Sequence, residues 1–201
     1  DSKRFAFYGP DDVEIGETVM TELSTLMGGT GKVAILGGSQ RAPNLRKRVQ
    51  GVKNVAATMP GIEIVGEFYH DETAEDAVAM LLSVHKAHPD LDGWAMVGGW
   101  PFFSQSLLGQ LDPGRYHIVA VDALPVQLPY IETGVVDVFL GQPTFKLGDI
   151  SVQTIINKIY LDKEVKEINQ MKLIRVWKDN LGGWSRQLRA WGYGDIPEEY
   201  L

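Results

Sequence analysis

The chain has 201 residues, of which 44% are hydrophobic, and a formal net charge of -7 at pH 7. This length and composition allow a sizeable core and exclude a disordered or fibrous chain, while the acidic balance excludes nucleic acid as a main partner, since phosphate binding needs a basic face. Cysteine is absent, which excludes disulfides and thiol chemistry, and no apolar run reaches the roughly 18 residues of a membrane span.

Apolar runs of strand length alternate with amphipathic patterns along the chain. The strands are predicted at residues 4–8, 32–36, 62–69, 93–97, 117–121, 135–140 and 172–177. The helices are predicted at residues 12–27, 44–59, 73–88, 102–111, 126–133 and 144–162. Strands that alternate with helices pair in parallel through right-handed crossovers, so we predict an α/β fold with a doubly wound, Rossmann-like parallel sheet.

Local signals mark the two ends of the first predicted helix and predict a further helix in the tail. Asp11 and Asp12 open the first helix, because acidic side chains favour its positive end, and Gly28 with Gly29 ends it. In the tail, the helical spacing of Trp184, Leu188 and Trp191 predicts a short amphipathic helix that clamps the domain. We expect residues 192–201 to be loose or draped over the domain, since chain termini are seldom ordered unless they are tied down.

Motifs of catalysis and cofactor binding fail on inspection. The segment GGTGK at 28–32 leads into a strand instead of leaving one, so it does not predict a phosphate loop. His85 and His88 have no third ligand nearby in the sequence and predict a solvated helix end rather than a metal site. Without an acid/base or nucleophile set, the sequence predicts no enzyme, no metal and no cofactor.

Polar residues stand at or near the exits of three predicted strands. Arg46 follows the strand at 32–36, Asp122 ends the strand at 117–121, and Gln142 follows the strand at 135–140. Ligands of open α/β sheets bind beyond the carboxyl ends of the strands, so these residues predict a small-molecule site. The alternatives are a solvated charge for Arg46 or Arg48, a helix N-cap for Asp122, and a hydrogen bond without ligand contact for Gln142.

The stretch NLRKRVQG at 44–51, preceded by GKVAILGG at 31–38, resembles a strand and helix start of the type I periplasmic sugar-binding proteins. Further segments resemble the same family in the same order: YGPDD at 8–12, HPDLDG at 88–93, IVAVDALP at 118–125, IETG at 131–134, and QP at 142–143 with Gly148. Together they cover about residues 4–162.

The resemblance implies two similar lobes with a sugar between them, of which this chain carries the second. It implies a second lobe at residues 1–142, a crossover helix at 143–164 that normally lies on the absent first lobe, and a return strand and tail at 165–201. An apolar stripe on that helix, Ile155, Ile156 and Ile159, would then lack its partner, which predicts self-association or an altered helix position.

The resemblance places the ligand contacts of this lobe on Arg46, Asp122 and Gln142. A guanidinium fork suits vicinal hydroxyls, and a carboxylate accepts hydrogen bonds from neighbouring hydroxyls. The family's Asn-Asp pair is replaced here by GWP at 99–101. Trp100 is therefore expected to present an apolar ring face to the sugar, with Phe102 or Phe103 as alternatives, although such rings are more often part of a core.

The function implied is the solute-binding component of a bacterial sugar ABC importer. It would bind a monosaccharide or related polyol and deliver it to a membrane permease, in the periplasm, after removal of a leader. The alternative is the effector-binding core of a LacI-type transcriptional repressor, which would be cytoplasmic. The strand start GKVA at 31–34 favours the transporter.

Overall fold

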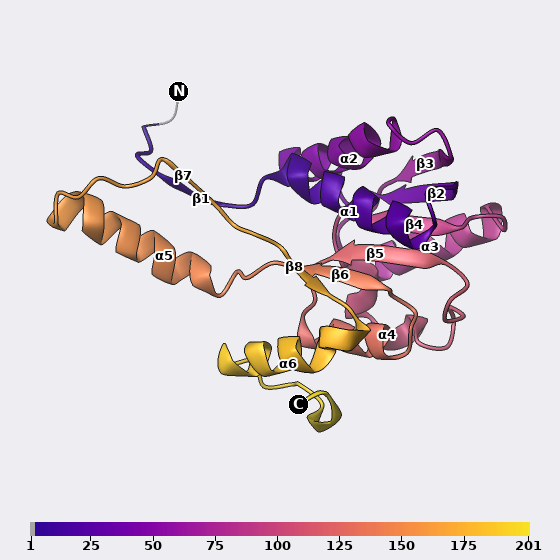
Figure 1. Ribbon diagram of the computed structural model, residues 1–201. Helices are drawn as coiled ribbons and strands as arrows, with labels where there is room; N and C mark the ends of the chain where they lie inside the picture. Colours follow the sequence, from indigo (N-terminus) through magenta and orange to yellow (C-terminus); the bar gives the residue numbers. More distant parts are fainter. Residues whose placement is uncertain (1–2) are drawn as a thin grey trace.

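A computed structural model describes residues 3–201, and its main feature is a six-stranded sheet (Figure 1). In sheet order the strands are β3 (Ile62–Phe68), β2 (Gly31–Leu36), β4 (Gly93–Met96), β5 (His117–Val121), β6 (Val138–Gly141) and β8 (Ile174–Val176). Neighbouring strands from β3 to β6 pair in parallel, and β8 pairs antiparallel with β6. The predicted α/β class with a doubly wound sheet is confirmed.

Helices cover both faces of this sheet, and alternate strand residues serve the two layers. Helices α1 (Asp12–Leu26) and α2 (Pro43–Ala56) pack on one face, over side chains such as Val33 and Val119. Helices α3 (Ala74–Ala87) and α4 (Leu128–Glu132) pack on the other face, over side chains such as Trp94 and Phe139. This alternation gives the period of two that a strand buried on both sides requires.

The predicted ends of α1 are confirmed. The Asp11 carboxylate accepts hydrogen bonds from the backbone N–H groups of Val13 and Glu14, at 2.9 and 3.3 Å. At the other end, Gly28 and Gly29 have φ angles of +66° and +80°, and the helix ends at Leu26. Both ends therefore follow from residues whose chemistry suits them.

Helices α1 and α2 approach each other so closely that two glycines are required at the contact. A Cβ atom on Gly16 would lie 1.8 Å from the carbonyl oxygen of Arg48, and one on Gly51 would lie 2.1 Å from the carbonyl oxygen of Val13. Since both obstacles are backbone atoms, neither position accepts a side chain without separating the helices. The contact fixes the middle of α2 against the first turns of α1.

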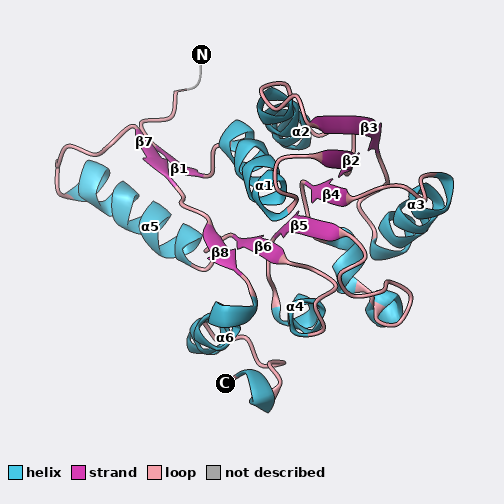
Figure 2. Ribbon diagram, turned by 45° about the vertical axis from the view of Figure 1, so that its right-hand side comes forward, coloured by secondary structure: helices cyan, strands magenta, loops and turns pink. Residues whose placement is uncertain are grey.

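A second, smaller unit stands apart from the main sheet (Figure 2). Strand β1 (Phe7–Gly9) pairs in parallel with β7 (Ile168–Gln170), and α5 (Lys146–Ile155) lies beside them. The sequence predicts a strand near β1, but the structure pairs it with β7 and not with the main sheet. Strand β7 itself is not predicted, because three mostly exposed residues leave no pattern.

Helix α5 buries none of its residues and continues into a single π-helical turn at Ile156–Tyr160. Apolar side chains of α5 and of this turn remain exposed, including Val152 and Ile155 in α5 and Ile159 in the turn. The helix does not lie on the six-stranded sheet. The predicted stripe of Ile155, Ile156 and Ile159 is exposed in this arrangement, and its missing partner stays a prediction.

The helix predicted at residues 102–111 is wrong. The structure has two short 3-10 turns there, Trp100–Phe103 and Gln105–Leu107. Ser104 separates them in an extended conformation, and its hydroxyl accepts a hydrogen bond from the N–H of Ser106 at 3.2 Å. A serine that bonds to nearby backbone in this way competes with helix formation.

The C-terminal segment packs on the sheet. The short turn Lys178–Asn180 leads into α6 (Leu181–Ala190), which buries Trp184 and Leu188 and confirms the predicted helix. Of the two arrangements expected for the tail, the structure shows the draped one, because Tyr193, Ile196 and Tyr200 pack against the core. A last 3-10 turn, Glu198–Tyr200, precedes the terminus. No helix within residues 3–201 has both the length and the apolar character needed to cross a bilayer.

Candidate functional site

A chain of polar side chains runs along the carboxyl ends of β4, β5 and β6. The Arg48 guanidinium donates hydrogen bonds to the Asp12 carboxylate and to the Val97 carbonyl oxygen, both at 3.0 Å. A longer contact of 3.5 Å joins its Nη2 to the Gln142 side-chain oxygen. Gln142 in turn donates from Nε2 to the Asp122 carboxylate at 2.8 Å. We call Arg48, Gln142 and Asp122 the rim triad.

The backbone around Asp122 is held in an unusual conformation. Asp122 and Ala123 have φ angles of +100° and +113°, which L-residues rarely adopt. Gln127 accepts hydrogen bonds from the N–H groups of Ala123 and Leu124, at 2.9 and 2.7 Å, and Trp184 donates to the Ala123 carbonyl oxygen at 2.7 Å. Such strain persists only where the surroundings enforce it, and it gathers at functional sites.

Of the predicted ligand contacts, Asp122 and Gln142 are brought together and Arg46 is not. The Arg46 side chain is exposed and donates to the carbonyl oxygens of Gln40 and Arg41, at 3.1 and 3.3 Å. Arg48, for which the sequence left open a solvated charge, is instead only 8% exposed and belongs to the triad. Arg46 remains a prediction without a contact to the other predicted residues.

Helical spacing could have shown from the sequence that Arg48, and not Arg46, lies on the buried face of α2. The buried face of α2 includes Leu45, Arg48, Val49 and Val52, which recur at the three- and four-residue steps of one helix face. Arg46 falls off this face. An arginine on the core-facing stripe must find buried partners, and Asp12 and Gln142 supply them.

The alternative interpretation of Asp122 as a helix N-cap does not hold. The next helical turn, Pro125–Gln127, has Leu124 at its cap position. The carboxylate of Asp122 instead receives the Gln142 amide. Both residues are only partly buried, so their remaining hydrogen-bonding capacity faces the rim.

The two aromatic candidates lie in different places. Trp100 is partly exposed and its ring covers Gly38 and Gly98, where a Cβ atom would lie 2.8 and 2.2 Å from ring carbons. Phe102 has no exposed surface and packs edge-to-face on Tyr130 and Phe139. Its expected contact with a ligand is therefore corrected: Phe102 is a core residue, and Trp100 is the ring at the rim.

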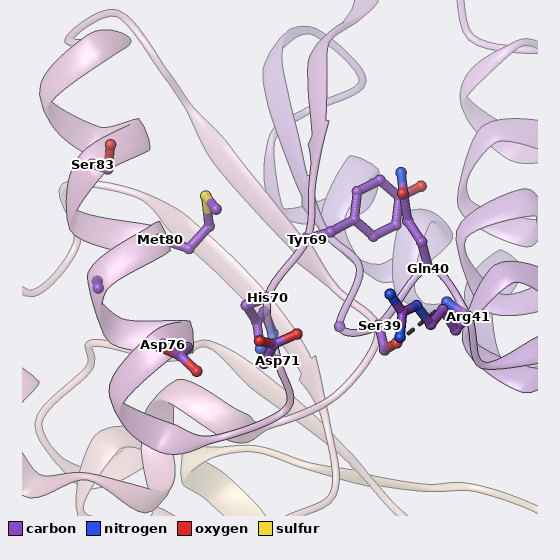
Figure 3. A pocket seen from close by; sticks show the side chains of 11 residues that line it. Ser39, Gln40, Arg41, Tyr69, His70, Asp71, Asp76, Met80 and Ser83 are labelled. Carbon is purple, nitrogen blue, oxygen red and sulfur yellow. Dashed lines mark hydrogen bonds between the residues drawn. The ribbon is translucent and has the colours of Figure 1, made fainter.

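A groove of about 790 Å³ lies to one side, between the β2–α2 loop and α3 (Figure 3). Ser39, Gln40 and Arg41 line one wall, and Asp76, Met80 and Ser83 line the other. Between them lies His70, whose ring meets the Trp100 ring edge-to-face at 5.1 Å. The groove is large enough for a small ligand, but the rim triad does not line it.

His70 has an unusual environment for a titratable group. It is 8% exposed, and neither ring nitrogen has a hydrogen-bond partner. Burial lowers the pKa of His70, because the charged form loses its hydration, and the nearby carboxylates of Asp76 and Asp71 oppose this effect. The ring is therefore neutral near pH 7.

The triad suits recognition of a hydroxylated molecule. A carboxylate accepts from hydroxyl groups, a guanidinium donates to hydroxyl oxygens, and the amide of Gln142 does both. Trp100 adds an apolar surface at the same edge of the sheet. Among the described residues no cluster of three or more potential metal ligands occurs.

The sequence matches one family model, described as periplasmic binding protein domain, over residues 1–163. No curated protein matches it. Among solved structures it is similar to an ABC transporter solute-binding protein from Burkholderia graminis in complex with D-arabinose. The identity is 24%, the match covers 89% of this chain and 63% of that chain, and the TM-score is 0.79.

Two further structures are similar at lower identity. A glucose-galactose binding protein from Geobacillus stearothermophilus is 22% identical, with 90% of this chain and 65% of that chain covered and a TM-score of 0.81. A carbohydrate transporter solute-binding protein from Agrobacterium radiobacter, in complex with D-arabinose, is 18% identical, with 94% and 66% covered and a TM-score of 0.83. The chain thus spans 63–66% of the length of these proteins. Their likeness establishes the fold, and the family match over residues 1–163 establishes that the chain belongs to the periplasmic binding protein domain family.

Proposed function

We propose that the chain binds a monosaccharide or related polyol as the solute-binding component of a bacterial sugar ABC importer. The observation that carries the proposal is the rim triad, in which Arg48, Gln142 and Asp122 share hydrogen bonds at the carboxyl ends of the strands. In open α/β sheets this edge is where ligands bind. The sugars bound by the similar solute-binding proteins support the same ligand class.

In this proposal the site lies between two lobes, of which residues 1–142 supply one. The exposed apolar side chains of α5 support this arrangement, since a helix that buries none of its residues has an apolar surface available to another lobe. A membrane permease would receive the sugar outside the cytoplasm. Closure of two lobes would enclose the ligand and exclude water, so binding to the 201 residues alone should be weaker.

The test measures the binding of a panel of sugars to the full-length protein that the gene encodes. Pentoses, hexoses and polyols are screened by thermal shift, because a ligand that binds only the folded state raises Tm. Calorimetry then gives the Kd of the best ligand. The variants Arg48→Lys and Asp122→Asn keep the size of each side chain but remove the guanidinium fork or the charge, and each should weaken binding by roughly 10- to 100-fold.

Arg46→Ala is the matched control, because Arg46 begins the same helix but contacts only backbone of its own loop. If the rim triad alone carries the site, Arg46→Ala should leave the affinity within about threefold of the wild-type value, because an exposed charge without contact to the triad contributes little. If no sugar or polyol changes Tm, the proposed function is wrong. If Arg46→Ala abolishes binding and Arg48→Lys does not, the site is misplaced.

A further inference from the structure

The last helix is brought back to the rim by the direction of β8. The register pairs Ile174 with Gly141 and Val176 with Phe139, so β8 starts at the rim and runs away from it. Helix α6 then returns after a short turn. Its far end reaches the rim, where the ring of Trp191 stacks on Phe145 with centroids 5.7 Å apart.

A cavity of about 170 Å³ lies between this returning segment and the rim triad. Its lining includes two residues of the triad and a group of apolar side chains from the C-terminal segment: Asp122, Gln142, Trp184, Leu188, Trp191 and Tyr193. The matched family segment ends at residue 163, so these apolar residues lie outside it. One wall of the cavity is therefore built by residues outside the family match, and it faces two residues of the rim triad.

The aromatic wall is fixed by its own contacts. Trp184 donates its indole N–H to the Ala123 carbonyl oxygen at 2.7 Å. Trp191 meets the Trp184 ring edge-to-face, with centroids 5.6 Å apart and an interplanar angle of 89°. The Trp191 ring also stacks on Phe145, with an interplanar angle of 9°. A wall ordered in this way loses little conformational freedom when a ligand binds.

The size and chemistry of the cavity define its occupant. A volume of about 170 Å³ is well below the roughly 300 Å³ at which small-molecule pockets begin, so the cavity fits part of a ligand and not the whole. Aromatic and leucine side chains offer few partners to hydroxyl groups but pack well on apolar ones. One end of the occupant must nevertheless be polar, because Asp122 and Gln142 lie at the same cavity.

We propose that the cavity is a subsite for an apolar substituent of the sugar, so that the preferred ligand is a monosaccharide carrying a small apolar aglycone. The sugar hydroxyls bind the rim triad, and the aglycone packs against Trp191 and Tyr193. The inference rests on the proposed function, because it needs the sugar to lie at Asp122 and Gln142.

The experiment compares each free hexose and pentose with its methyl and 4-nitrophenyl glycosides in calorimetric titrations. At least one 4-nitrophenyl glycoside should bind roughly tenfold more tightly than its parent sugar, since it adds aromatic packing. The nitrophenyl group should also quench tryptophan fluorescence on binding. In Trp191→Ala most of this gain in affinity and of the quenching should be lost, while the affinity for the parent sugar should change far less.

Trp177→Ala is the matched control, because Trp177 is partly exposed beside Arg175 and does not line the cavity. It should retain the tenfold preference. Tyr193→Ala provides a second variant in case Trp191→Ala does not fold. If free sugars bind at least as tightly as every glycoside, or if Trp191→Ala weakens both equally, the subsite is wrong while the sugar site stands. If neither sugars nor glycosides bind, the proposed function fails together with the subsite.

Discussion

At the scale of single residues, His70 makes the stability of the protein depend on pH. Both ring nitrogens are buried without a hydrogen-bond partner, and burial lowers the pKa of the group from its usual 6.5. The unfolded chain therefore takes up a proton at a pH where the folded protein does not. The stability that neutral His70 contributes is complete above about pH 6.5, and it is lost as the pH falls below that value.

The variant His70→Phe tests this dependence, because phenylalanine keeps a ring against Trp100 but cannot titrate. Denaturant unfolding from pH 8 to pH 5 should show that the free energy of unfolding falls more steeply in the wild type than in the variant. At pH 8 His70 is neutral in both the folded and the unfolded protein, so the free energies of unfolding measured there serve as the reference. Parallel curves for the two proteins would rule out a role for His70.

The same scale shows what the sequence could and could not predict about the site. Asp122 and Gln142 are predictable, because each follows an apolar run whose end must reach the rim. Arg48 is less so, since two arginines stand two residues apart and only the helix face distinguishes them. The strained backbone at Asp122 and Ala123 cannot be read from the sequence, because Gln127 and Trp184 enforce it from elsewhere in the fold.

At the scale of elements, the contact between α1 and α2 positions the guanidinium of the triad. Gly51→Ala should place a methyl group against the Val13 carbonyl oxygen and force the helices apart. Overpacking of this kind costs about 1–3 kcal/mol in the free energy of unfolding. Because Arg48 lies one turn before Gly51, the same change should weaken the proposed binding of sugar. Urea denaturation and calorimetry measure the two effects.

Gly183→Ala is the control for this variant. Gly183 lies exposed in α6, where an added Cβ meets nothing within 4 Å. Alanine favours the helix there and should raise the free energy of unfolding by up to about 1 kcal/mol. Equal losses of stability in both variants would contradict the importance of the close helix contact.

Elements with strong periodicity were predictable, and the exceptions have physical causes. The strands of the main sheet lie close to their predicted ranges because each is an apolar run between turn signals. The segment at 102–111 has apolar residues at helical spacing, yet the Ser104 carbonyl oxygen accepts the Tyr130 hydroxyl and the backbone there is extended. Tertiary contacts override local preference in such a segment.

At the scale of the whole molecule, the exposed face of α5 governs association. Val152, Ile155 and Ile159 are 57%, 47% and 63% exposed on one helix. Contiguous apolar surface of this kind drives contact between molecules. We expect the 201-residue chain to form concentration-dependent oligomers in sedimentation velocity. The double variant Ile155→Ser, Ile159→Ser should shift the population to monomer, and a wild type that stays monomeric at every concentration would contradict this expectation.

The outer edge of the sheet determines what such oligomers become. Strand β3 is one of the two edge strands of this sheet, and it carries Glu63 and Glu67, the latter paired with Lys53 at 2.6 Å. Charges on an edge strand oppose the docking of another strand, so we expect that the β3 edge does not serve as a template for growth. Particles built through α5 should therefore stay small and closed, without fibres and without the binding of amyloid dyes.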